Sequence, residues 1–189
     1  RDDLPKKQNA GLAAVPGETA GQEAGPARVR AVQQALDAAR ATPETKALVA
    51  AGMKPISNWT NAGRATPAAA LETMLWAGVT GDFDTLATTF AFNAAGKAKL
   101  DAWYAAFPPA VRSKYTAERI VAPPFAETTA PLRLMLPNFR RGARNIGFRI
   151  VSQRDQGRGL PTVLGVVYAV GAGADWSQDE LFSLDADGW

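Results

Sequence analysis

The period of the hydrophobic pattern changes once along the chain, and this change limits the possible folds more than any other feature. Up to Phe107, apolar residues recur every three or four positions, as on one face of an α-helix. From Arg144 onward they alternate with other residues, as in β-strands. Helices that precede strands in this way favour an α+β fold over alternating α/β units. We therefore expect a layer of helices packed on an antiparallel meander.

Alanine limits the size of the core. About 89 of the 189 residues are hydrophobic, but 38 are alanine, which leaves about 51 bulky apolar side chains. That number suffices for one core of about 100–150 residues. Residues 1–27 hold few of these side chains and predict a flexible arm or linker. Residues 28–64 predict a helical extension followed by a loop, and residues 65–189 predict the compact α+β domain.

Capping residues mark several helix starts. Thr42 and Thr66 each precede a proline, and Asp82 precedes a third apolar stripe. We expect helices over 27–41, 43–51, 67–78, 83–90 and 94–107. Between the second and third, residues 54–64 predict a loop in which Trp59 packs against the main domain.

The later elements follow from prolines and alternation. Four prolines between Ala122 and Pro137 predict an irregular segment, with at most a short edge strand near residues 132–136. Strands are expected over 144–150, 163–170 and 180–184. A turn at residues 185–188 would lead into one more strand that begins at Trp189.

Two missing residue types exclude several chemistries. The chain has no histidine, which removes the commonest general base at neutral pH and the commonest metal ligand. It has no cysteine, which removes thiol nucleophiles, disulfides, zinc fingers and iron–sulfur clusters. We expect no catalytic residue set, no metal and no cofactor.

Charge is unevenly distributed along the chain. Between Arg133 and Arg158 there are seven arginines and one acid, whereas the stretch from Asp175 to the end has five acids and no base. One interpretation is two neighbouring strands with complementary exposed faces. The other is a surface that binds anions or nucleic acid. Arg149 could point outward to the acidic strand or inward as an anion anchor. A second basic cluster that includes Arg112 and Arg119 could be a solvated surface or a contact with an acidic ligand.

Three segments carry a family resemblance. They are Ala65-Thr66-Pro67 with Ala70, Gly81-Asp82-Phe83-Asp84-Thr85-Leu86, and Asp185-Ala186-Asp187-Gly188-Trp189. Residues 65–189 resemble the nuclear-transport-factor-2-like (NTF2-like, SnoaL-like) superfamily, and most of all its uncharacterised bacterial members, which are often exported or membrane-anchored. The resemblance implies a cone in which helices pack on a curved antiparallel sheet. Catalytic members often place a His–Asp or Tyr–Asp pair in that cone, and this chain has no histidine.

A cone implies an interior pocket with aromatic walls. The candidate wall residues are Trp76, Trp103, Tyr104, Tyr115, Phe148 and Tyr168. The alternative is that these side chains fill the core. Asp82 and Asp84 are the acids closest to the helical mouth, with Asp82 also interpretable as a helix cap, while Glu72 and Asp101 fall on polar helix faces where solvent would surround them.

Three functions follow from these patterns. The first is a non-catalytic module that binds a small ligand or a protein and forms a homodimer through the outer face of its sheet. The second is a SnoaL-like isomerase or dehydratase acting on a small apolar ligand. The third is nucleic-acid or anion binding through the Arg133–Arg158 cluster. The chain begins at Arg1 without methionine, so a preceding anchor is the expected route to a membrane, and the compartment stays undetermined.

Overall fold

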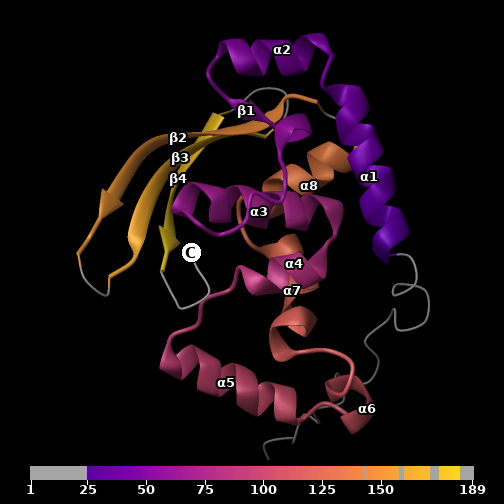
Figure 1. Cartoon of the computed structure of the whole chain (residues 1–189), viewed down its shortest axis with the longest axis vertical. Helices are drawn as coiled ribbons and strands as arrows, with labels where there is room; N and C mark the ends of the chain where they lie inside the picture. Colours follow the sequence, from indigo (N-terminus) through magenta and orange to yellow (C-terminus); the bar gives the residue numbers. More distant parts are fainter. Residues whose placement is uncertain (1–24, 143, 158–159, 171–174, 184–189) are drawn as a thin grey trace, which may run out of the picture.

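The computed structural model describes residues 25–142, 144–157, 160–170 and 175–183. Within these ranges the helices precede the main strands, which confirms the α+β class (Figure 1). The elements are α1 (Gly25–Ala39), α2 (Pro43–Ala50), β1 (Lys54–Pro55), a 3-10 turn (Ile56–Asn58), α3 (Pro67–Thr80), α4 (Phe83–Thr88), α5 (Ala94–Ala105), α6 (Pro109–Arg112), α7 (Ala117–Thr128), α8 (Leu132–Arg140), β2 (Ile146–Asp155), β3 (Thr162–Val170) and β4 (Asp175–Phe182).

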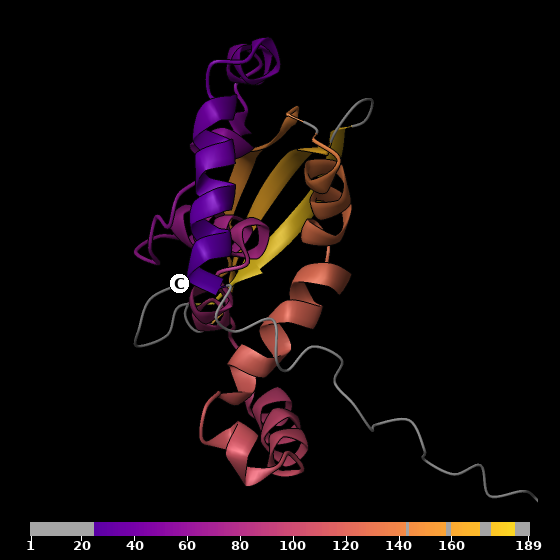
Figure 2. The ribbon, with the colours of Figure 1, turned by 90° about the vertical axis from the view of Figure 1, so that its right-hand side faces the viewer.

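The four strands form one antiparallel sheet in the order β1-β2-β3-β4. The long strands bend strongly, and α3 and α8 pack against the concave face (Figures 1 and 2). A register shift between Ile150 and Ser152 of β2 accounts for part of the bend, since a bulge increases local twist and curvature. No described helix covers the other face of the sheet.

Helix α5 and the short α6 lie at the end of the molecule away from the sheet (Figures 1 and 2). Leu100 is the buried residue of α5, so this helix contributes little to the core. Of the other large apolar side chains in this segment, Trp103 is exposed while Tyr104 and Phe107 are half-buried, so the helix belongs to the periphery of the fold.

The predicted helix caps at Thr42, Thr66 and Asp82 are confirmed. Each side-chain oxygen accepts a hydrogen bond from the backbone N–H three residues later, at 3.3, 3.1 and 3.0 Å respectively. The predicted end of α3 at Gly78 is wrong, because the helix continues to Thr80 and stops at Gly81, whose φ is +78°. At Gly78 the absent side chain instead lets α3 approach α8: a Cβ there would lie 2.5 Å from Cδ1 of Leu132.

The prediction of an irregular segment over residues 122–137 is wrong. Helix α7 contains Pro123 and Pro124, and α8 contains Pro137. A proline inside a helix removes a hydrogen-bond donor and crowds the preceding turn. Tertiary packing offsets that cost, since α7 packs along α4 and α8 buries an apolar stripe. The stripe of α8 consists of Leu132, Met135, Leu136 and Phe139.

Residues 28–64 belong to the same core as the rest of the described chain. Leu36 of α1, Ile56 and Trp59 are each exposed by 1% or less and join the main hydrophobic cluster. The expected loop over 54–64 contains the two-residue strand β1, which pairs with Gly147 and Phe148 of β2.

Two expectations concern the ends of the chain. Strand β4 begins at Asp175, earlier than the expected start at Glu180. Residues 1–24 of the expected flexible arm, Leu184, and the expected turn and final strand at 185–189 lie outside the described residues.

Candidate functional site

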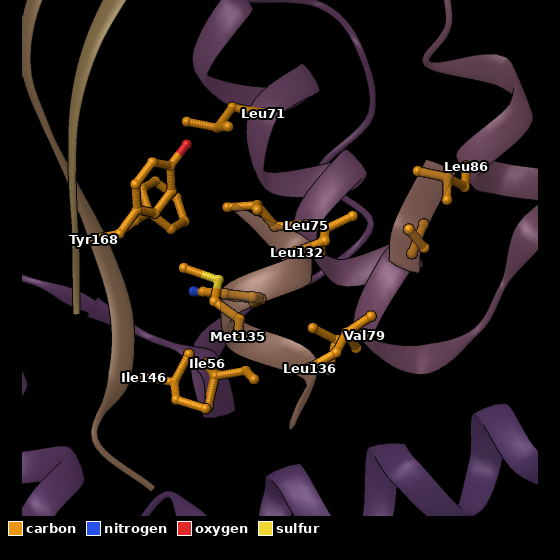
Figure 3. Close-up of a cluster of buried hydrophobic side chains, with 14 of the residues drawn as sticks. Ile56, Leu71, Leu75, Val79, Leu86, Leu132, Met135, Leu136, Ile146 and Tyr168 are labelled. Atoms are coloured by element: carbon orange, nitrogen blue, oxygen red, sulfur yellow. The ribbon is translucent and has the colours of Figure 1, made fainter. Parts of the chain in front are cut away.

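The space between the sheet and the helices is filled by side chains. Figure 3 shows Ile146 and Tyr168 of the sheet pointing toward Leu71 of α3 and Met135 of α8. All four are fully buried, and the same cluster includes Trp59, whose ring centroid lies 5.7 Å from that of Phe148. Of the six predicted wall residues, the structure brings Phe148 and Tyr168 together in this core.

The other four wall candidates lie elsewhere. Trp76 is half-buried at the core margin, and its indole N–H donates to Oε1 of Gln33 on α1 at 3.2 Å. Trp103 is 42% exposed on α5 and packs edge-on against Phe107. The Tyr104 hydroxyl lies 2.8 and 2.6 Å from the carbonyl oxygens of Arg112 and Tyr115, where it holds the α6 turn against α5. Tyr115 lines a surface hollow described below.

A hydrogen-bonded carboxylate lies on the inner face of the sheet. The hydroxyl of Tyr168 donates to Oε1 of Glu180 at 2.7 Å, and the side-chain amide of Gln178 donates to the same oxygen at 3.2 Å. The ring of Trp176 stacks on Tyr168 at 5.3 Å. Burial raises the pKa of Glu180, despite these two donors, and burial beside Glu180 also raises the pKa of Tyr168.

Sequence reasoning missed Glu180 because acidic residues on an edge strand resemble a solvated face. The alternation of β4 did carry a signal, since Trp176, Gln178, Glu180 and Phe182 share the face opposite Asp175 and Asp179. Neither of the two surface hollows that we describe includes Tyr168 or Glu180.

The prediction that solvent surrounds Glu72 is wrong. This residue is 6% exposed, and its Oε1 accepts hydrogen bonds at 3.0 Å from both the backbone N–H and the hydroxyl of Thr60. Its Oε2 pairs with the ammonium group of Lys54. Glu72 thus ties α3 to β1 and to the segment after Trp59.

The outer face of the sheet carries charge in stripes. Strand β2 presents Arg149 and Arg154, whereas β4 presents Asp175 and Asp179. Between them β3 contributes Val163, Gly165, Val167 and Ala169, of which only Val167 is partly exposed. Two large apolar side chains stand exposed on this face: Val151 at 55% and Leu181 at 67%.

Arg154 and Asp179 form an ion pair at 2.7 Å across β3. The expected complementary faces therefore exist, but the basic and acidic strands flank a third strand and are not neighbours. Of the two orientations considered for Arg149, the structure shows the outward one, but its Nη1 donates to the carbonyl oxygen of Ala51 at 3.3 Å and not to an acid.

The arginines of the Arg133–Arg158 cluster do not share one surface. Arg133 and Arg140 lie on α8, which packs on the concave side of the sheet, and Arg140 pairs with Glu127. Arg149 and Arg154 lie on the opposite, outer side. Arg158 lies outside the described residues.

Two shallow hollows adjoin at α4. One, of about 570 Å³, is lined by Asn61, Gly63, Arg64, Ala65, Thr73, Asp84, Thr85 and Thr88. The second, of about 370 Å³, lies between α4 and α7 and is lined by Asp84, Ala87, Thr88, Lys114, Tyr115, Thr116, Glu118 and Arg119. Asp84 and Thr88 contribute to both. The structure thus places the predicted anion contact Arg119 in a hollow, while Arg112 donates from Nε to the carbonyl oxygen of Phe107 at 3.0 Å.

Within the described ranges, no group of three or more acidic side chains is arranged to hold a metal ion. Among the helices of those same ranges, none combines the length and the apolar character needed to cross a bilayer.

Comparisons with known proteins give no relative for this chain. No protein-family model, no curated protein and no solved structure matches it.

Proposed function

We propose that this protein is a non-catalytic interaction module with an NTF2-like fold, and that it pairs with a second copy of itself through the outer face of its sheet. The order of elements supports the fold assignment: helices come first, and a bent antiparallel sheet then holds them in its concave side (Figure 1). The filled interior supports a function on the surface.

The striped outer face is the observation that carries the pairing. A two-fold axis parallel to β3 would lay β2 of one copy over β4 of the other. The basic stripe at Arg149 and Arg154 would then face the partner's acidic stripe at Asp175 and Asp179. The exposed Leu181 and Val151 would lose their contact with water. A two-fold interface needs such a self-complementary surface.

The mass in solution tests this pairing. We expect light scattering after size-exclusion chromatography to give about 40 kDa, twice the 20.0 kDa of one chain. Leu181→Arg should shift the mass toward 20 kDa, because it replaces an apolar side chain that the pairing would bury on β4 with a charged one. Trp103→Arg is the control, since Trp103 is also an exposed apolar side chain (42%) but lies on α5, at the end of the molecule away from the sheet (Figure 1). A monomer of the unmodified chain at tens of micromolar would overturn the pairing.

One observation favours a second candidate function, that of an isomerase or dehydratase. Such an enzyme needs a general base whose pKa lies near neutrality, and burial raises the pKa of Glu180 beside the Tyr168 hydroxyl. Both reactions begin with removal of a proton from carbon. Hydrogen–deuterium exchange at the α-carbons of cyclohexanone, followed by NMR in D2O, tests this candidate. Exchange catalysed by the protein and lost in Glu180→Gln would support it, whereas exchange at the rate of buffer alone would end it.

A further inference from the structure

The hollow between α4 and α7 contains an arginine that is fixed in position. The Nε of Arg119 donates to Oδ1 of Asp84 at 2.6 Å. Its guanidinium carbon lies 5.3 Å from the ring centroid of Phe83 and 5.8 Å from that of Tyr115. The side chain is only 24% exposed. Two aromatic rings and one carboxylate therefore restrict a group that is usually mobile.

Most of the hydrogen-bonding capacity of Arg119 remains available. A guanidinium group has five N–H donors, and the hydrogen bonds of the described residues engage Nε alone. No described side-chain nitrogen or oxygen is both buried and without a partner, so the free Nη groups reach the hollow or the solvent. A fixed guanidinium with two free Nη groups matches the geometry of an incoming carboxylate.

The other lining residues narrow the ligand class. Lys114 adds an exposed ammonium group with no ion pair among the described residues, while Tyr115 and Ala87 supply an apolar wall. Asp84 and Glu118 also line the hollow, and their negative charges repel a dianion more strongly than a monoanion. Glu118 is paired with the ammonium group of Lys97 at 3.0 Å.

We propose that this hollow binds a small monocarboxylate with a flat apolar body. The carboxylate pairs with the Nη groups of Arg119 and with the ammonium group of Lys114, and the apolar body lies against the ring of Tyr115. The site is made from α4, α7 and the turn before α7, and it shares no residue with the outer face of the sheet. It therefore does not depend on the proposed pairing of two copies.

Three probes of similar shape test the ligand class by NMR titration of the full chain at pH 7.5. Benzoate carries the proposed charge, benzamide has the same shape without charge, and phenyl phosphate is mainly a dianion. We expect benzoate to shift the backbone amide signals of residues 114–119 in a saturable manner. Benzamide should bind at least tenfold more weakly, because it has no negative charge and offers one acceptor oxygen where a carboxylate offers two for a bidentate pair with Arg119. Phenyl phosphate should also bind more weakly than benzoate.

Variants then assign the binding to the hollow. Arg119→Gln should weaken the binding of benzoate at least tenfold, and Lys114→Gln should weaken it about threefold. Lys99 is an exposed lysine of α5 outside the hollow, so Lys99→Gln should leave the affinity for benzoate unchanged. The side chain of Lys114 makes no described hydrogen bond or ion pair, so its variant stays informative even where Arg119→Gln lowers stability. No saturable shift with benzoate, equal binding of benzamide, or an equal loss in Lys99→Gln would overturn the site. Stronger binding of phenyl phosphate would overturn the monocarboxylate assignment.

Discussion

Gly147 of β2 is the position where the structure makes its sharpest prediction about stability. A Cβ at this residue would lie 2.9 Å from the carbonyl oxygen of Lys54 and 3.2 Å from Cα of Pro55. Both are backbone atoms of β1, the strand that pairs with Gly147. Neither can rotate away as the end of a side chain can. Gly147→Ala must therefore push β1 away from the sheet or bend β2.

The size of the effect follows from two opposing contributions. Overpacking of this kind costs about 1–3 kcal/mol. Replacing glycine by alanine also restricts the unfolded chain, which stabilises the folded state by about 0.4–1 kcal/mol. We expect Gly147→Ala to lower the free energy of unfolding by about 1–2 kcal/mol, which corresponds to a fall in Tm of about 2–8 °C for a chain of this size.

Gly165 of β3 provides the matched comparison. A Cβ there would lie 2.4 Å from Oγ of Ser152, but this hydroxyl belongs to an exposed residue and can adopt another rotamer. We expect Gly165→Ala to leave Tm unchanged or to raise it slightly, as measured by circular dichroism and urea unfolding of both variants. If Gly147→Ala proves as stable as the unmodified chain, the close approach of β1 to β2 is refuted.

Three further changes test the core and its charged groups. Trp59→Ala should lower the free energy of unfolding by about 3–5 kcal/mol in urea titrations, because a fully buried indole that donates to the carbonyl oxygen of Lys54 is removed; a loss below 1 kcal/mol would contradict its place in the core. Glu72→Ala should cost about 1–3 kcal/mol by the same measurement, since both hydrogen bonds from Thr60 are lost, and an unchanged midpoint would argue against that anchor. Burial raises the pKa of Glu180 above its value in the unfolded chain, so the folded state holds more protons between the two pKa values. The free energy of unfolding should therefore fall as the pH rises through that window and stay constant above it. Glu180→Gln should abolish this pH dependence in unfolding midpoints measured from pH 4 to pH 8. An identical pH dependence in the variant would assign the effect to another group.

The local signals in the sequence predicted the helical layer well. Thr42, Thr66 and Asp82 act through hydrogen bonds to backbone groups three residues away, so neighbouring residues alone determine them. The apolar pattern of residues 163–170 likewise predicted a strand, and β3 spans Thr162–Val170. In each case the residues that determine the structure belong to one helix or strand and its immediate neighbours in the sequence.

The errors have a different origin, because tertiary contacts decide those positions. Prolines gave a local argument against α7 and α8, but the helical spacing of Leu132, Met135 and Phe139 was the stronger signal, since it let α8 bury an apolar face. Glu72 looked solvated because its partners Lys54 and Thr60 are distant in sequence. A pattern of neighbouring residues does not predict a contact between residues that are distant in sequence.

The candidate aromatic residues illustrate the same limit at the level of function. The sequence alone could not distinguish aromatic side chains that line a pocket from those that fill the core, because this depends on how closely the helices approach the sheet. Gly78 lets α3 approach Leu132 of α8, and Tyr168 then fills the remaining space under the sheet. Because the helices and the sheet pack so closely, binding sites are expected on the surface of the molecule and not between these layers.

The two proposed surfaces can be separated by experiment because they use different elements. The pairing face consists of the outer sides of β2, β3 and β4, whereas the carboxylate site consists of α4, α7 and the turn before α7. Leu181→Arg should therefore change the mass in solution without changing the affinity for benzoate, and Lys114→Gln should do the reverse. A variant that altered both properties would show a coupling between the surfaces. Two helices join them: α3 contacts both β3 and α4, and α8 contacts both β3 and α7.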